Sequence, residues 1–472
     1  MVLGSRSSEE WLQGTTFKTN IYHLQGLDPQ SRSLLAEKIL ERHVVAHRIS
    51  QIRDDADFAR LMKLLAGYPL AMEVVLANLR QQSPKEILEK LQAADVNLDN
   101  KRESGDKTES ILKCVEYSHS NLSQDAQKLL LCLAPFSGFI DRSDIPSYVN
   151  QLQKLESFKD YAFDKFDAAI QEAIDWGLLS GSDLSPSPSP TRRGGQEEER
   201  LLAIQPVFPY FLKTKLATLD ESTREALQEG FKNHYQDLAG YYNRLMKSKD
   251  AQERQLGKFF CEQDYENLYK ALKICLEKQE SINIFLGLDK YFELINDIQR
   301  QLKLSEFVCQ AQEAYPSELR TGEIGYEIVM ALDRLAFGYL QTQKYQEARE
   351  SYQKIGELLL QISDVEERQK QSALATTYHQ LGIVAQQLRE FEQAREYYQQ
   401  ALALFIEFSD RYSQARTYGA LGVLAEVQED YTEARTNLQK ALEICIEYKD
   451  EYWGAIAQQA LERLPDSPEN QD

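Results

Sequence analysis

The chain has 472 residues and a formal net charge of −20, and 42% of its residues are hydrophobic. The length suits about three domains, and the apolar fraction is enough for a sizeable core. The acidic balance argues against nucleic acid or an anionic membrane surface as the main partner, because both bind to basic faces.

Targeting and redox features predict a cytoplasmic protein. Residues 1–11 lack a basic end followed by an apolar run, so no signal peptide is expected. The sequence contains no run of about 18 apolar residues, so no membrane span is expected. His43 and His47 have zinc-like spacing on an expected helix, but no third ligand is evident and no metal is predicted. The cysteines form no CxxC pair and are expected to be buried thiols. They are Cys114, Cys132, Cys261, Cys275, Cys309 and Cys445.

The N-terminal segment contains three short patterns in order. Residues 1–6 read MVLGSR and end in Arg6, and residues 21–40 read IYHLQGLDPQSRSLLAEKIL. The sequence at 67–71, Gly-Tyr-Pro-Leu-Ala, opens a further helix. Pro69 suits the first turn of that helix with or without a ligand.

Residues 101–220 predict a winged-helix domain. The stretch 110–140 gives the first helices, and 166–180 gives a helix that leads into a short apolar strand. The Ser-Pro stretch 180–200, which also holds the pair Gly194–Gly195 and an acid run, cannot bury a core and is expected to be a disordered loop. The apolar stretch 201–212 then gives a second strand that runs towards a helix. Helix, strand, loop and strand together correspond to the wing.

The winged helix raises the hypothesis of a DNA-binding transcription regulator. The helix that would enter the groove lies within 144–176, which contains three lysines, no arginine and seven acids. A groove-reading helix is basic, so this segment favours a structural spacer over DNA contact. The charged residues are Lys154, Lys159 and Lys165, and Asp144, Glu156, Asp160, Asp164, Asp167, Glu172 and Asp175.

The C-terminal part of the chain predicts an array of helix pairs. Residues 221–325 show helical periodicity with a weak repeat consensus, which predicts one or two degenerate pairs. Beyond them, a leucine followed by a small residue recurs at intervals of 46 and 40 residues, and an alanine follows each time at the same distance. The leucine pairs are Leu335–Ala336, Leu381–Gly382 and Leu421–Gly422, and the alanines are Ala348, Ala394 and Ala434.

This pattern is typical of antiparallel helices that approach closely at small residues. Over 326–447 it resembles the tetratricopeptide repeat in a longer form. A helix over 450–464 would cap the stack before a disordered tail at 467–472. The resemblance implies a concave groove that binds peptides or helices. The alternative fold is an ordinary helical bundle, and the alternative role is a purely architectural stack. Helical phase suggests four groove-facing residues, Tyr378, Tyr397, Arg416 and Tyr418.

The order of these segments resembles the NB-ARC–repeat kind of signal-transduction ATPases with numerous domains (STAND). The resemblance implies that residues 1–6 form a short strand and that residues 21–40 frame the start of a small helical subdomain. It also implies that Arg6 matches the arginine that senses the terminal phosphate, and that Pro69 matches the proline that packs on adenine. Gln205 stands where the family usually carries a histidine that contacts the β-phosphate. The P-loop G-x-x-x-x-G-K-[ST] is absent, because the one Gly-Lys pair, at 257–258, lacks both the first glycine and the Ser or Thr. The chain therefore resembles the C-terminal portion of such a protein.

We expect a mainly α chain with an NB-ARC remnant over 1–100, a winged helix over 101–220, degenerate repeats over 221–325 and a tetratricopeptide array with a capping helix over 326–466. The leading hypothesis is a non-enzymatic regulatory scaffold that binds a protein or peptide, and neither nucleic acid nor membrane. The first alternative is a nucleotide-dependent switch whose ATPase core is missing from this chain or supplied by another, and the second is the transcription regulator. No cofactor is expected, and ADP or ATP would enter only with that core. Oligomerisation on activation stays open.

Overall fold

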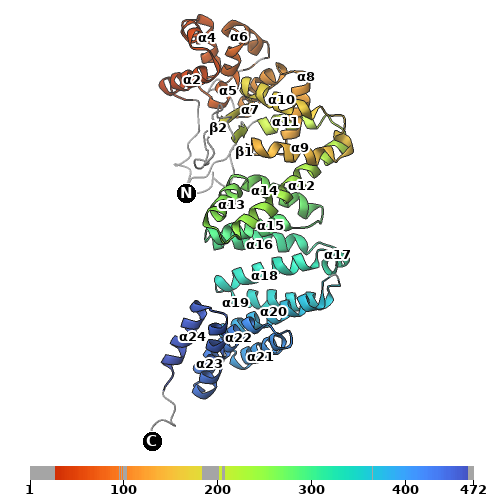
Figure 1. Ribbon diagram of the computed structural model, residues 1–472. Helices are drawn as coiled ribbons and strands as arrows, with labels where there is room; N and C mark the ends of the chain where they lie inside the picture. Colours follow the sequence, from red (N-terminus) through yellow and green to blue (C-terminus); the bar gives the residue numbers. More distant parts are fainter. Residues whose placement is uncertain are drawn as a thin grey trace, which may run out of the picture. The chain divides into compact units, whose positions relative to one another are not determined.

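The structure is a computed structural model that describes residues 27–94, 96, 98, 104–182, 201–204, 208–363 and 365–465. Within these ranges the chain is mostly helical, as the sequence predicts. It separates into two compact units, residues 1–235 and 236–472 (Figure 1). No helix in the described ranges is long and apolar enough to cross a membrane. The predictions for 1–6, for most of the loop 180–200, for Gln205 and for the tail 467–472 fall outside these ranges.

Several helices form the first part of the N-terminal unit. Their apolar faces share one core, in which Ile39, Leu61 and Val75 are fully buried. The chain enters α5 through Gly67, whose φ is +74°, and a Cβ there would lie 2.6 Å from the carbonyl oxygen of Leu27. Glycine is therefore required before this helix. The helices are α2 (Pro29–His43), α3 (Ala46–Arg53), α4 (Ala56–Leu64), α5 (Pro69–Leu76), α6 (Pro84–Ala93) and α7 (Ser104–Ser120).

A three-stranded antiparallel sheet lies in the second part of this unit, in the order β1-β3-β2. Ile140 of β1 pairs with Leu202 of β3, and Leu179 of β2 pairs with Ile204 of β3. Both strands predicted beside the Ser-Pro stretch are present. The sequence gives no signal for β1, because three residues are too few to show alternation. The strands are β1 (Phe139–Asp141), β2 (Leu179–Ser182) and β3 (Leu201–Ile204).

Short helices surround this sheet, and an aromatic cluster anchors the long helix that follows. Phe136 contacts the rings of Tyr148 and Phe231 edge to face, with centroids 4.9 Å and 5.1 Å apart. The helices are α8 (Gln124–Leu130), α9 (Ile145–Gln153), α10 (Phe166–Asp175), α11 (Phe208–Leu216) and α12 (Glu221–Met246). Single 3-10 turns complete the unit, namely η2 (Ala77–Arg80), η3 (Leu131–Leu133), η4 (Arg142–Asp144), η5 (Glu156–Phe158) and η6 (Phe163–Lys165).

The second unit begins within α12 and continues with helices that lack a clear repeat consensus. Gly257 of the Gly-Lys pair lies inside α13, where a Cβ would come 2.8 Å from the Cβ of Leu245. This glycine therefore serves close packing between two helices and not a phosphate loop. The helices are α13 (Ala251–Gln263), α14 (Tyr265–Glu277), α15 (Asn283–Leu294), α16 (Ile298–Gln312) and α17 (Ser317–Thr321).

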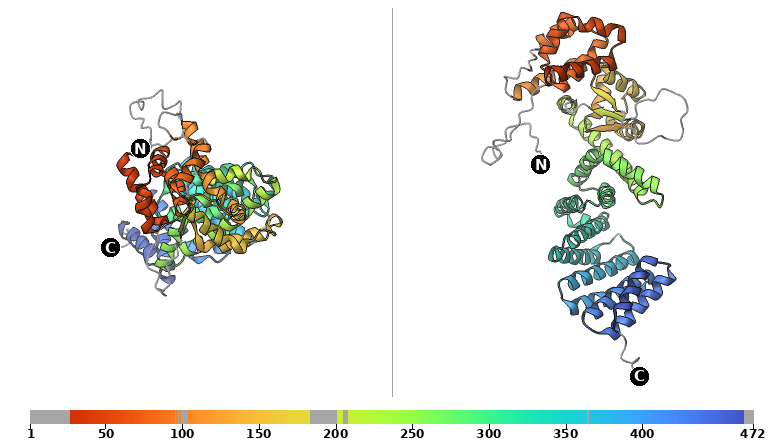
Figure 2. Two further views of the ribbon diagram at one scale, coloured as in Figure 1. Left: turned by 90° about the horizontal axis from the view of Figure 1, so that it is seen from above. Right: turned by 90° about the vertical axis from the view of Figure 1, so that its left-hand side faces the viewer.

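The remaining helices form antiparallel pairs with one helix added at the end. Figure 2 shows these helices stacked side by side. The pairs coincide with the periodicity of the sequence, and α24 corresponds to the predicted final helix. The helices are α18 (Gly325–Gln341), α19 (Tyr345–Gln361), α20 (Glu367–Gln387), α21 (Phe391–Glu407), α22 (Arg411–Val427), α23 (Tyr431–Glu447) and α24 (Glu451–Arg463). We call α18–α24 the repeat array.

A recurring tight turn joins most helices of the repeat array. Between α22 and α23, Glu429 adopts a left-handed φ of +64°, and the next amide, that of Asp430, donates to the carbonyl oxygen of Ala425 at 3.0 Å. The Asp430 carboxylate then accepts from the amide of Glu433 at 2.9 Å. One helix is thus closed and the next is capped within two residues.

Candidate functional site

The small residues singled out in the sequence lie between the paired helices. A Cβ on Gly382 would be 2.5 Å from the ring of Tyr398, and one on Gly422 would be 2.6 Å from Cγ of Leu438. These contacts set the distance between the two helices of each pair. All nine residues at the predicted packing positions are buried, and these are Leu335, Ala336, Ala348, Leu381, Gly382, Ala394, Leu421, Gly422 and Ala434.

The first helices of the pairs present one accessible face. Residues at equal repeat positions on α18, α20, α22 and α24 are half-buried on α18 and exposed on the other three helices. A continuous surface of this kind is how solenoid proteins bind elongated partners. We call it the A-helix face, and it comprises Tyr326, Met330, Ser372, Thr376, Tyr412, Arg416, Tyr452 and Ile456.

The four residues chosen from helical phase have different surroundings. Arg416 is exposed on the A-helix face. Tyr378 is half-buried and stacks on Tyr397 of the paired helix α21, with ring centroids 6.3 Å apart. Tyr418 is half-buried, and the ammonium group of Lys440 on the paired helix lies 5.2 Å from its ring centroid. The three tyrosines therefore contact the helix pair itself.

A pocket of about 450 Å³ opens on the A-helix face between α18 and α20. Its apolar wall includes Tyr326, Val329 and Met330 of α18, and Ile355 of α19 also lines it. The opposite wall is α20, with small polar side chains such as Thr376. The pocket thus joins an apolar wall to a polar one, which suits a side chain that has both an apolar and a polar part.

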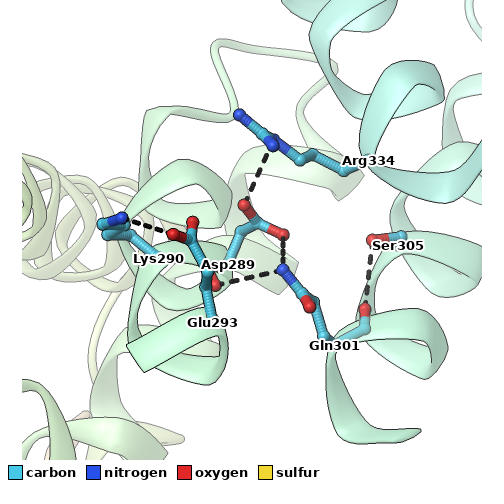
Figure 3. Close-up of polar contacts among 6 residues, drawn as sticks. All are labelled: Asp289, Lys290, Glu293, Gln301, Ser305 and Arg334. Atoms are coloured by element: carbon cyan, nitrogen blue, oxygen red, sulfur yellow. Dashed lines mark hydrogen bonds and ion pairs between the residues drawn. The ribbon is translucent and has the colours of Figure 1, made fainter. Parts of the chain in front are cut away.

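Two adjacent charged residues of α18 line this pocket, and one of them is already neutralised. The Nε of Arg334 lies 3.3 Å from Oδ2 of Asp289, a buried residue of α15. Figure 3 shows that the other carboxylate oxygen of Asp289 accepts a hydrogen bond from Gln301 of α16, at 2.8 Å. The Arg334 charge is therefore balanced from outside the pocket.

Asp333 has no such partner. In the described ranges, burial and the charge of Arg334 are what act on its carboxylate, and no side chain forms a hydrogen bond with it. Burial raises the pKa of Asp333, and the neighbouring Arg334 lowers it by less. The pocket therefore contains a carboxylate that has lost part of its hydration without gaining a hydrogen bond, which is an energetically unfavourable arrangement.

The other end of the A-helix face is aromatic. Tyr412 donates a hydrogen bond from its hydroxyl to Asp450 at 2.6 Å, and its ring lies 5.6 Å from that of Tyr448. Tyr452 and Trp453 of α24 are 69% and 42% exposed and contact each other edge to face. Exposed aromatic side chains in a cluster are typical of protein-interaction surfaces.

The array has a polar end at α24. Glu462 occupies the position that Gly382 and Gly422 hold in the preceding repeats, and it is exposed. Its side chain would prevent the close approach that a paired second helix makes at those glycines. This face of α24 is therefore expected to remain exposed to solvent and not to pack against a further paired helix.

Of the residues matched to a nucleotide site, only Pro69 lies in the described ranges, and the two histidines with zinc-like spacing do not share a helix. Pro69 is the first residue of α5, whereas Arg6 and Gln205 lie outside the described ranges. The helix expected to carry both His43 and His47 is interrupted, because α2 ends at His43 and α3 begins at Ala46. No cluster of three or more His, Cys, Asp or Glu in the described ranges could hold a metal ion. The six cysteines are buried, and none of them forms a disulfide bond.

The comparison with protein families decides the nature of the array. The tetratricopeptide repeat model matches residues 327–407 and 373–447. The chain therefore contains tetratricopeptide repeats. The match covers three helix pairs, α18 to α23, and leaves the first unit without a family assignment. No curated protein matches the sequence.

The comparison with solved structures gave matches of low identity. A putative kinesin light chain from Podosopora anserina with nearly identical TPR-like repeats is 16% identical over 47% of this chain and 96% of that chain, with a TM-score of 0.33. A STAND protein with a tetratricopeptide repeat sensor from Pyrococcus horikoshii is 14% identical over 93% of this chain and 73% of that chain, with a TM-score of 0.27. These TM-scores are too low to establish a common fold.

Proposed function

We propose that this protein is an interaction scaffold that holds a segment of a partner protein along the A-helix face of its tetratricopeptide repeats. The observation that carries the proposal is the accessibility of equal positions on four successive helices, α18, α20, α22 and α24, which are half-buried on α18 and exposed on the other three. Tetratricopeptide arrays use such a face for extended peptides and helices. Binding, and not catalysis, is the proposed role.

The exposed groups on this face can supply binding energy. Tyr452, Trp453 and Ile456 provide apolar and aromatic surface, and Arg416 provides a charge with several donors. Aromatic residues and arginine are the groups that contribute most to protein–protein affinity. The partner proposed here is a protein segment, with no role for nucleic acid.

The test uses the full chain and peptides selected from a random display library. The double variant Arg416→Ala/Ile456→Ala removes two side chains of the A-helix face. The matched control, Leu360→Ala/Ile446→Ala, removes two side chains of the second helices α19 and α23 that are 75% and 68% exposed. We expect the first variant to weaken peptide binding about tenfold or more in fluorescence anisotropy, and the control to bind like the unchanged chain. Equal losses in both variants, or a failure to select any peptide, would refute the proposal.

We further propose that the first unit is the end of an NB-ARC-type domain followed by a winged helix, and that it relays a state to the repeats. Support comes from the Gly-Tyr-Pro-Leu-Ala motif, whose proline begins α5, and from the small sheet that follows α8. Since no P-loop is present in this sequence, we expect titration calorimetry with ADP, or with ATP and magnesium, to give no binding heat. A clear ADP binding isotherm would instead favour the nucleotide-dependent switch over the scaffold.

A further inference from the structure

The residues that line the pocket between α18 and α20 indicate which kind of partner side chain would bind there. Its lining combines the Asp333 carboxylate with apolar contacts from Val329, Met330 and Ile355. Ile355 is 1% exposed and Val329 is 5% exposed, so both are held in place by the packing of the helices beneath. A charged group beside a fixed apolar wall suits a side chain with an aliphatic stem and a charged head.

The charges around the pocket leave one negative charge in its lining. Arg334 is paired with Asp289, so its charge is balanced. Glu366 and Arg368 are both exposed at the rim, and they carry opposite charges. Asp333 remains as the uncompensated group. A cation that enters the pocket would be attracted by this carboxylate, whereas an anion would be repelled.

The second helix beneath the pocket provides no positive charge to Asp333. Tyr352 of α19 is fully buried, and its hydroxyl has no hydrogen-bond partner in the described ranges. Burial and then the negative charge of Asp333 raise the pKa of Tyr352. The tyrosine is therefore protonated at physiological pH and carries no charge that could balance the carboxylate.

We propose that this pocket accepts a lysine or arginine side chain of an extended partner peptide, with Asp333 as the counter-ion of its charged head. The inference rests on the proposed function, because it assumes a peptide on the A-helix face. The aliphatic stem of the entering side chain contacts Met330 and Tyr326, and its head reaches the carboxylate in the lining. The free energy lost in burying Asp333 is recovered when the cation binds.

The partner is thus a protein segment with an exposed basic residue, in keeping with the net charge of −20 of the chain. The aromatic end of the face, with Tyr452 and Trp453, also favours cations over anions, since the faces of aromatic rings are electron-rich. A segment with several basic residues would therefore find favourable contacts at both ends of the A-helix face.

The test uses peptide sublibraries with one fixed position, occupied in turn by arginine, lysine, glutamine, norleucine or glutamate. Binding to the immobilised full chain is compared with binding to Asp333→Asn and Thr376→Arg. The first variant removes the charge and keeps the side-chain shape. The second adds a positive charge from the opposite wall, using the residue that α22 carries at the same repeat position, Arg416. Glu357→Gln, which removes an exposed charge of α19 outside the pocket, is the matched control.

We expect the arginine and lysine sublibraries to bind the unchanged chain about tenfold or more tightly than the glutamine and norleucine sublibraries, and the glutamate sublibrary to bind most weakly. Asp333→Asn and Thr376→Arg should both remove this preference, and Glu357→Gln should keep it. Asp333→Asn should also leave the thermal midpoint unchanged or raised, which separates loss of binding from loss of the fold.

Two outcomes would overturn the inference while leaving the proposed function in place. One is a set of sublibraries that bind the A-helix face with no preference for arginine or lysine. The other is a preference that survives in Asp333→Asn and in Thr376→Arg, since the cation would then sit elsewhere. Peptides that bind the chain equally well after Arg416→Ala/Ile456→Ala would instead count against the proposed function itself.

Discussion

At the residue scale, two glycines of the repeat array provide opposite tests of the packing argument. We expect Gly382→Ala to lower the free energy of unfolding by about 1–2 kcal/mol, because its new Cβ would lie 2.5 Å from the buried ring of Tyr398. That ring cannot shift easily, since its hydroxyl donates to Oε1 of Gln386 at 2.9 Å. The gain in helix propensity from Gly to Ala, about 1 kcal/mol, does not offset the overlap.

Gly419→Ala is the matched control within α22. Its nearest neighbour would be the Cβ of Ala441, at the ordinary distance of 4.0 Å, so only the gain in helix propensity should remain. We expect an increase of about 1 kcal/mol in the free energy of unfolding. Thermal unfolding followed by circular dichroism measures both variants. The packing argument is wrong if the two alanines shift the midpoint in the same direction.

The sequence reveals some residues of the site and hides others, for a physical reason. Gly382 and Ala394 recur in phase because close helix contact requires small side chains, and periodicity detects such a requirement. Tyr378 was selected by helical phase alone. Phase cannot separate the side of a helix that faces its pair from the side that faces the groove. Asp333 gives no local signal, because its role depends on how α18, α19 and α20 surround it.

At the element scale, the turn between paired helices places non-glycine residues in a left-handed conformation. Glu429 has a φ of +64° and is exposed. A side chain in this conformation costs roughly 1–2 kcal/mol, which glycine avoids. We expect Glu429→Gly to raise the free energy of unfolding by about 0.5–1 kcal/mol, after the entropy that glycine loses on folding is subtracted.

The control for this prediction is Ala455→Gly, at an exposed position inside α24. Glycine there has no left-handed residue to relieve, and it should lower the free energy of unfolding by about 1 kcal/mol. Urea unfolding of the two variants in parallel gives the comparison. If Glu429→Gly destabilises the chain as Ala455→Gly does, the left-handed conformation at the turn does not lower the free energy of unfolding of the chain.

The same turn explains how much of the element order could be predicted. Aspartates such as Asp430 and Asp450 cap the following helix and mark its start in the sequence, and the leucine–glycine pairs mark the helix before it. The strand β1 has no comparable marker. It is a strand only because it pairs with β3, a partner about sixty residues away, and local sequence patterns do not carry such a contact.

At the scale of the whole molecule, buried histidines link the fold to pH. Burial is the main cause that lowers the pKa of His119, His234 and His379 to about 4 in each case. Two of these residues lie in the first unit and one in the repeat array. The pKa of an unfolded histidine is about 6.5. Between these values the unfolded chain binds protons that the folded chain does not, so acidification favours unfolding.

The stability from these histidines is therefore complete above about pH 6.5 and is lost progressively as the pH falls towards 4. His379 is 6% exposed, and its Nδ1 lies 3.2 Å from the hydroxyl of Thr417 on α22. A shift of this size corresponds to at most about 3 kcal/mol of folding free energy.

We expect His379→Asn to reduce the dependence of the thermal midpoint on pH between about 6.5 and 4.5, whatever it does to the midpoint at neutral pH. His47→Asn, at an exposed position of α3, should leave the dependence as it is. An unchanged pH dependence in His379→Asn would mean that this ring takes up its proton without opening the contact between α20 and α22, and burial would then not be what couples the array to pH.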